Sequence, residues 1–166
     1  MGFLPFPADD ELAPDARAAM DAFLAEHPGP LSNLDRTLLG SAAVFDAYLR
    51  WFELRDEVVP FLGERAVTLF CLAISEGYAA PYCVEFFRRA LLDGGDDPGA
   101  PQVTEAEQLL RDWGRAIGEG AASIDAVLTE RVEQTFQPKL RLALVAFAGF
   151  MVATALFTVV GQVPSE

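Results

Sequence analysis

The segment ERAVTLFCLAIS, residues 64–75, decides the fold class of this chain of 166 residues. Between Ala66 and Ile74 only Thr68 is polar, so a helix built from this segment is apolar nearly all round. Such a helix is stable only when other elements surround it, whereas a helix on a protein surface keeps one polar face. The sequence therefore predicts a helix buried in the core, ending near Gly77.

Helical patterns continue on both sides of this core segment. Apolar residues recur at intervals of three and four, and helix-starting and helix-ending residues separate the runs. Thr104 with Glu107 three residues later forms a capping box, which marks a helix start. The first expected helix begins at Pro14 and is closed by His27-Pro28-Gly29. Two more are expected from an Asn33 cap to Leu39 and from a Ser41 cap to about Arg55. The others run from Pro81 to Gly94-Gly95, from Thr104 through Ile117, and from a Ser123 cap to about Phe136.

No strand pattern is found, so the fold class predicted for the chain is all-α. The length is close to the ~150 residues typical of one domain, and no low-complexity linker divides the chain. We therefore predict a single domain over residues 1–166.

The C-terminal segment LALVAFAGFMVATALFTVV, residues 142–160, contains 19 residues without a charge. That length is sufficient to span a membrane. The segment is diluted by Ala, Gly and Thr, however, and these small residues suit close packing between helices. No aromatic belt or basic cluster follows its far end. We expect a helix buried in a core or a subunit interface, with a membrane anchor as the alternative.

Charge and composition exclude several classes of partner. The formal net charge of −13 repels the phosphates of nucleic acids and anionic membranes. Two cysteines and one histidine are too few for a disulfide framework or a histidine metal cluster, so we expect no metal and no other cofactor. The acidic, proline-containing N-terminus does not resemble a signal peptide, which favours a reducing cytoplasm. A hydrophobic content of 52% with 13 Phe suggests that some apolar surface is buried between subunits of a homo-oligomer.

The order of four segments resembles the carboxymuconolactone decarboxylase superfamily, in particular its alkylhydroperoxidase-like (AhpD-like) branch. The segments are HPGPLSNLDRTLLGSAAVFDAYLRWF (27–52), FLGERAVTLFCLAISEGYAAPYC (61–83), RALLDGG (89–95) and LALVAFAGFMVATALFTVVGQV (142–163). The resemblance covers the chain from about Glu26 onward. It implies an all-helical AhpD-like bundle that assembles as a dimer, trimer or hexamer and buries its last helix.

Redox members of that family carry Cys-x-x-Cys at a helix start, a His four residues after the second Cys, and a Glu twelve residues before the first. With Cys83 as the second cysteine, the first falls on Ala80, the His on Phe87 and the Glu on Thr68. Three of the four motif residues are absent. The resemblance therefore implies a peroxidase site that is degenerate.

Two interpretations of the thiols remain open. Cys83 is expected in the first turn of a helix, where the helix dipole favours a thiolate, but Val84 and Phe86 make its surroundings apolar and raise the pKa of the thiol. Cys83 is then an inert core residue. Alternatively, Cys83 acts alone, or it forms a surrogate redox pair with Cys71. Cys71 lies one helical turn after Thr68 and could therefore face Cys83 from the neighbouring helix.

The other ionisable residues are expected at helix ends. Glu64, one helical turn before Thr68, could place a carboxylate in a pocket with Tyr78 and Tyr82. We nevertheless interpret Glu64, Glu76 and Glu85 as solvated charges. The only histidine, His27, is interpreted as a helix C-terminal cap.

Two functions follow from these expectations. The first is a non-redox, oligomeric relative of the AhpD-like proteins with a pocket for a small apolar molecule near Tyr78, Tyr82, Cys83 and Phe87. The second is an active enzyme, either an antioxidant thiol peroxidase using Cys83 alone or with Cys71, or a decarboxylase-like catalyst.

Overall fold

The computed structural model describes residues 3–165, and this part of the chain forms helices and no β-strand. The predicted all-α fold class is confirmed. The helices are α1 (Pro14–Glu26), α2 (Asn33–Leu38), α3 (Ala42–Phe52), α4 (Val59–Leu62), α5 (Glu64–Tyr78), α6 (Pro81–Asp93), α7 (Glu105–Glu119), α8 (Ala126–Thr135) and α9 (Pro138–Val160), with short 3-10 turns at Asp9–Glu11, Glu53–Glu57 and Ala121–Ser123.

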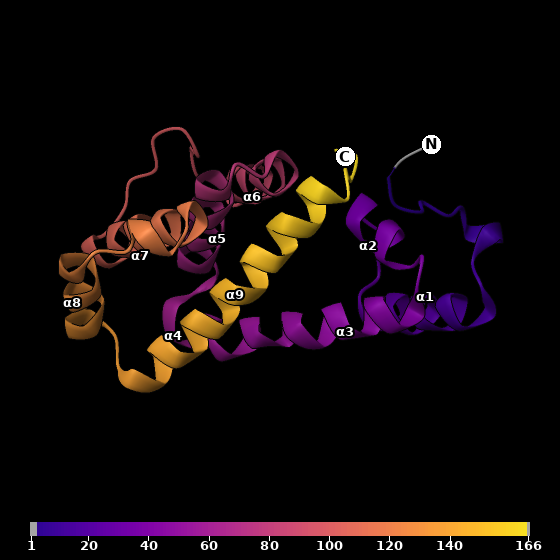
Figure 1. Cartoon of the computed structure of the whole chain (residues 1–166), viewed down its shortest axis with the longest axis horizontal. Coiled ribbons are helices and arrows are strands. Elements are labelled where there is room, and N and C mark those ends of the chain that lie inside the picture. The colour runs from indigo at the N-terminus through magenta and orange to yellow at the C-terminus, as the bar shows by residue number, and fades with distance from the viewer. Residues whose placement is uncertain (1–2, 166) are drawn as a thin grey trace.

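Helix α5 is the centre of the fold, as the apolar segment at residues 64–75 predicts. Every residue from Ala66 to Ser75 except Thr68 is buried. Helices α6, α7 and α9 pack against α5. Helix α9 crosses the molecule diagonally, with α5–α8 on one side and α1–α3 on the other (Figure 1). Both described ends of the chain lie near the C-terminal end of α9.

The apolar side chains form two main core clusters that α9 connects. The first core cluster includes Phe70 and Cys71 of α5, Trp113 of α7, and Phe147 and Phe150 of α9. The second core cluster includes Leu34, Phe45, Tyr82, Cys83 and Ala155, from α2, α3, α6 and α9. Tyr48 and Phe87 pack against both clusters and so lie at their junction.

Glycines let α5 and α7 approach closely. A Cβ added to Gly118 of α7 would lie 2.2 Å from the carbonyl oxygen of Ile74, and one added to Gly77 of α5 would lie 2.3 Å from that of Arg115. Because the obstructing atoms are backbone, they cannot move aside as a flexible side chain does. Helix α5 ends at Tyr78, one residue after the predicted end near Gly77, and Gly77 itself lies at the contact with α7.

Most predicted helix boundaries are confirmed, and two of the predicted caps are wrong. The capping box of Thr104 and Glu107 is present, as is the helix start at Pro81. The cap of α2 is Ser32 and not Asn33, because Asp35 lies three residues after Ser32 and completes a capping box. The cap of α8 is Asp125 and not Ser123, since the Asp125 carboxylate accepts a hydrogen bond from the backbone N–H of Leu128.

Helix α9 is buried on only one face, although the sequence predicts a buried helix. Its length and composition would allow it to cross a membrane, yet 44% of its most apolar 18-residue stretch is buried within the chain itself. Leu144, Phe147 and Phe150 are almost fully buried, whereas the Leu142 side chain is 72% exposed. The long apolar pattern reflects a helix with one face in the core and one apolar face on the surface.

Candidate functional site

The turn between α5 and α6 places Cys83 at the N-terminal end of α6, inside the core. Ala79 ends α5 in the left-handed conformation, with φ of 59°, and Ala80 precedes α6 as its N-cap. Pro81 then occupies the first helical position, where its missing N–H costs nothing. Cys83 therefore lies in the first turn of α6, as predicted.

The Cys83 side chain is buried and contacts α9. Its Sγ lies 3.5 Å from Oγ1 of Thr158, and the thiol and the hydroxyl share a hydrogen bond. Only 3% of Cys83 is exposed. Burial raises the pKa of the Cys83 thiol above its usual range, and the hydrogen bond with Thr158 opposes the shift only in part. The thiol is consequently protonated at neutral pH.

Cys71 is a second buried free thiol, in the first core cluster. Burial raises its pKa well above the usual range, the charge of Arg55 opposes this shift, and the nearby Cys83 adds to it. Cys71 and Cys83 belong to different core clusters, although Cys83 is close enough to contribute to the raised pKa of Cys71. Their action as a surrogate redox pair stays a prediction.

A second polar contact lies one helical turn away along α9. The hydroxyl oxygens of Thr154 and Tyr48 are 3.5 Å apart, and Thr154 also donates to the carbonyl oxygen of Phe150 at 3.0 Å. Burial raises the pKa of the Tyr48 phenol well above its usual range, the hydrogen bond with Thr154 opposes that shift, and neighbouring Cys83 adds to it. Two hydroxyls of α9, from Thr154 and Thr158, thus bring Tyr48 and Cys83 into one row of uncharged polar groups.

An apolar groove between α3 and α9 reaches this row from solvent. The groove has a volume of about 270 Å³, and Tyr48 and Thr154 provide its hydroxyl groups. Trp51, which is 52% exposed, forms part of its rim. The remaining lining residues are Leu38, Val44, Ala47, Phe150, Ala153 and Phe157. A small apolar molecule in this groove would have its polar end beside Tyr48.

The structure separates the positions of the lost redox motif from this groove. Ala80 is fully buried, and Phe87 packs at the junction of the two core clusters, in edge contact with Phe86. The Thr68 hydroxyl donates to the carbonyl oxygen of Glu64 in its own helix. None of these three residues supplies a base that could accept a proton from Cys83.

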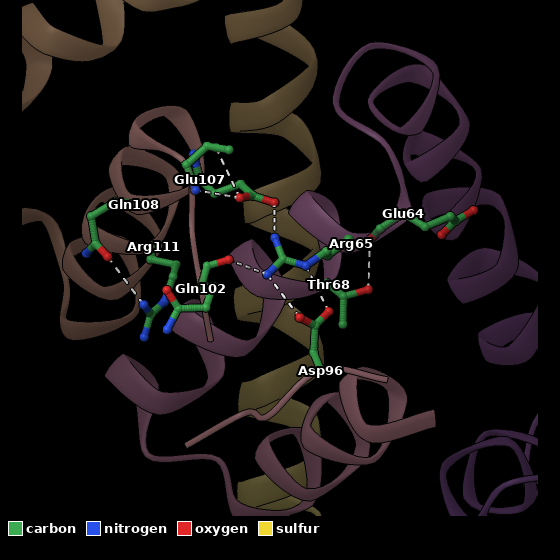
Figure 2. Close-up of polar contacts among 9 residues, drawn as sticks. Glu64, Arg65, Thr68, Asp96, Gln102, Glu107, Gln108 and Arg111 are labelled. Carbon is green, nitrogen blue, oxygen red and sulfur yellow. Dashed lines mark hydrogen bonds and ion pairs between the residues drawn. The ribbon is translucent and has the colours of Figure 1, made fainter. Parts of the chain in front are cut away.

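Glu64 and Thr68 lie at the edge of a polar cluster centred on Arg65 (Figure 2). Arg65 pairs with Asp96 through Nε and Nη2, at 2.8 and 3.0 Å, and with the carboxylate of Glu107. It also donates to the carbonyl oxygen of Gln102 at 2.7 Å. This cluster ties the loop between α6 and α7 to the start of α5. The Glu64 carboxylate points away from it and pairs with Arg55.

The remaining predicted candidates have structural partners. Glu76 pairs with Arg88 at 3.0 Å and with Arg115 at 2.7 Å, so it connects α5 with α6 and α7. His27 follows the last residue of α1, its backbone N–H donates to Phe23, and its ring stacks on the Phe23 ring. This agrees with the interpretation of His27 as a cap.

Three further residues predicted to lie near Cys83 differ in their contacts and exposure. The Tyr82 hydroxyl accepts a hydrogen bond from the backbone N–H of Leu34 at 3.2 Å. Glu85 is exposed on α6. Tyr78 is half-buried against the second core cluster, and neither Tyr78 nor Tyr82 lines the α3–α9 groove. The pocket predicted around Tyr78, Tyr82, Cys83 and Phe87 therefore stays a prediction.

Sequence reasoning missed the groove and its hydroxyls. A signal was present, because Thr154 and Thr158 are one turn apart on an otherwise apolar helix. Among residues 3–165, no group of three or more His, Cys, Asp or Glu side chains is arranged to hold a metal ion. Comparisons with protein-family models, with curated proteins and with solved structures found no match for this chain.

Proposed function

We propose that this protein binds a small, uncharged, mainly apolar molecule in the α3–α9 groove and does not perform thiol redox chemistry. It is thus a non-redox protein of AhpD-like type, as the resemblance of its segments suggests. The observation that carries the proposal is the groove itself, which is apolar apart from the hydroxyls of Tyr48 and Thr154 and the indole N–H of Trp51.

The lining of the groove defines the class of ligand. A volume of about 270 Å³ is close to the lower limit of ligand pockets, so the ligand is small. The lining residues carry no charge, and the net charge of −13 disfavours an anion. A phenol both donates and accepts hydrogen bonds, so Tyr48 suits one hydroxyl or carbonyl group on an otherwise apolar body.

The state of the thiols supports the second part of the proposal. A thiolate and not a thiol attacks peroxides and disulfides, so a buried Cys83 with a raised pKa is a weak nucleophile. A dithiol cycle also needs a resolving thiol within reach and a base. Ala80 and Phe87 stand where the family motif places the other cysteine and the histidine.

The proposal can be tested with two probes of similar shape, cyclohexanol and methylcyclohexane. Binding is followed by the fluorescence of Trp51, and Trp51→Phe should abolish the signal because the other tryptophan, Trp113, does not line this groove. We expect both probes to bind the wild-type protein. Tyr48→Phe should weaken cyclohexanol about fivefold, the equivalent of one hydrogen bond of ~1 kcal/mol, and leave methylcyclohexane unchanged.

The matched control is Tyr78→Phe, which removes a hydroxyl from a half-buried tyrosine outside the groove. This variant should bind both probes as the wild-type protein does. If neither probe binds at its solubility limit, the proposal is wrong. If Tyr78→Phe and not Tyr48→Phe weakens cyclohexanol, the ligand occupies the pocket predicted beside Cys83 instead.

A further inference from the structure

Helix α9 carries a continuous apolar stripe on the face that points away from the core. Leu142, Val145 and Leu156 are 72%, 56% and 49% exposed, and Ala146 and Gly149 between them are exposed as well. These residues are separated by three, four or seven positions, so they line one side of the helix. The stripe is defined as Leu142, Val145, Ala146, Gly149, Val152, Ala153 and Leu156. Val152 and Ala153 are only half-exposed, because Val152 also contacts the first core cluster and Ala153 lines the α3–α9 groove.

The sequence of this stripe is nearly symmetric about Gly149. Leucines stand seven positions before and seven positions after it, at 142 and 156. At three and four positions to each side, one residue is Val and the other is Ala. A two-fold axis through Gly149 would bring Leu142 of one copy beside Leu156 of the other, and each Val beside an Ala. A surface of this kind is complementary to itself, as a two-fold interface requires.

No contact among the described residues requires a glycine at position 149. A Cβ at this position would meet no atom within 4 Å, and a glycine inside a helix costs about 1 kcal/mol relative to alanine. The close contact that would exclude a side chain at Gly149 is therefore not supplied by the described residues. A second helix crossing at this point would supply it, because small residues allow helix axes to approach closely.

Charge and area also favour a second copy as the occupant. The 19 residues from Leu142 to Val160 carry no charge, so two stripes can meet without bringing the charges of two acidic chains together. The neighbouring Trp51 and Phe52 of α3 are 52% and 44% exposed and widen this apolar surface. A stable interface buries ~800 Å² per partner, which a stripe along one helix reaches only with such neighbours. Both rings contact Phe150 of α9.

We propose that two copies of this chain associate through the α9 stripe, with the two α9 helices antiparallel and crossing at Gly149. Trp51 and Ala153 belong both to this interface and to the lining of the α3–α9 groove, so association and ligand binding affect one another there. It specifies the surface, the symmetry and the register of the dimer.

The first test measures the mass of the full-length protein by sedimentation velocity. The wild-type chain should have twice its own mass of 18.0 kDa. Gly149→Leu should weaken association at least 100-fold while the isolated chain gains helix propensity, so loss of the dimer cannot be attributed to unfolding. Val127→Leu is the control, because Val127 is 68% exposed on α8 and lies outside the stripe; this variant should remain dimeric.

The second test checks the register. Leu142→Cys and Leu156→Cys are prepared as separate variants, mixed, and oxidised with diamide, which accepts the two electrons and two protons released as each disulfide forms. The antiparallel register predicts a cross-linked dimer in the mixture and little in either variant alone. A monomeric wild-type protein, wild-type recovery only from membranes, or cross-linking of single variants as efficient as in the mixture would each overturn the proposal.

Discussion

The thiol of Cys83 lies 3.5 Å from the hydroxyl oxygen of Thr158, inside the core between α6 and α9. A hydrogen bond to a neutral hydroxyl does not compensate for the loss of water around a thiolate, and the pKa of Cys83 is accordingly raised. The position that carries the second cysteine in the redox motif therefore holds a protonated thiol here.

The first prediction concerns the reactivity of both thiols. Iodoacetamide at pH 7 should modify the folded protein at least ten times more slowly than the urea-unfolded protein, because burial limits access and ionisation. Val127→Cys, which adds an exposed thiol on α8, should gain one fast-reacting group and serves as the control. A native thiol that reacts as fast in the folded as in the unfolded chain would show that Cys71 or Cys83 is exposed and ionised.

The second prediction concerns the contact between α5 and α7. Gly118→Ala places a Cβ where the backbone of Ile74 and Tyr78 already lies, so we expect a loss of about 2–3 kcal/mol in the free energy of unfolding. Urea unfolding measures this loss. Gly149→Ala, whose Cβ meets no atom, should fold with wild-type helix content. Equal stability of Gly118→Ala and the wild-type protein would contradict the close approach of the two helices.

The third prediction concerns the Arg65 cluster and pH. Hydrogen bonds from Arg65 hold the pKa of Asp96 below its usual range. Burial of Glu107 works against its charged form, but hydrogen bonds from the Thr104 backbone and from Arg65 outweigh this and lower its pKa.

Both carboxyl groups have a lowered pKa in the folded state. The stabilisation from their ion pairs with Arg65 is therefore present above the unfolded-state pKa of about 4 and is lost as the pH falls through the folded-state pKa values. Arg65→Met should therefore lower the urea midpoint modestly at pH 7, since Arg65 is partly exposed. The difference from the wild-type protein should shrink below pH 4. Arg89→Met, on the exposed side of α6, should change little at either pH. A difference that grows on acidification would contradict this assignment.

The fourth prediction concerns the role of α9 in the core. Truncation before Leu142 removes Phe147 and Phe150 and leaves the apolar faces of α5 and α7 uncovered. The shortened protein should aggregate, as size-exclusion chromatography will show. A soluble, monodisperse truncated protein would mean that α9 contributes little to the core.

The sequence was sufficient to predict the helices but not which of their faces would find neighbours. The segment around Phe70 is apolar on all sides, so its helix is stable only at the centre of the fold, where other helices cover every face. The segment around Gly149 is equally apolar. Which of its faces stays exposed depends on where α3 and α5 end, and the periodicity of the sequence does not give those positions. The contact between Tyr48 and Thr154 joins residues 106 positions apart, so no local pattern could reveal it.

The helix caps were also only partly predictable from the sequence. Ser32 and Asn33 are both good cap residues, and the register of Asp35 decides between them.

Peroxide consumption tests most directly the claim that this protein works by binding and not by thiol redox chemistry. Hydrogen peroxide and an organic hydroperoxide are supplied with dithiothreitol, and the rate above the uncatalysed reaction is compared between wild-type protein and Cys83→Ser. Thr68→Glu, Ala80→Cys and Phe87→His combined in one chain are a reference with the family's motif restored. We predict no turnover by wild type or Cys83→Ser. Fast turnover by the wild-type protein that is lost in Cys83→Ser would contradict the claim and identify Cys83 as the peroxidatic residue.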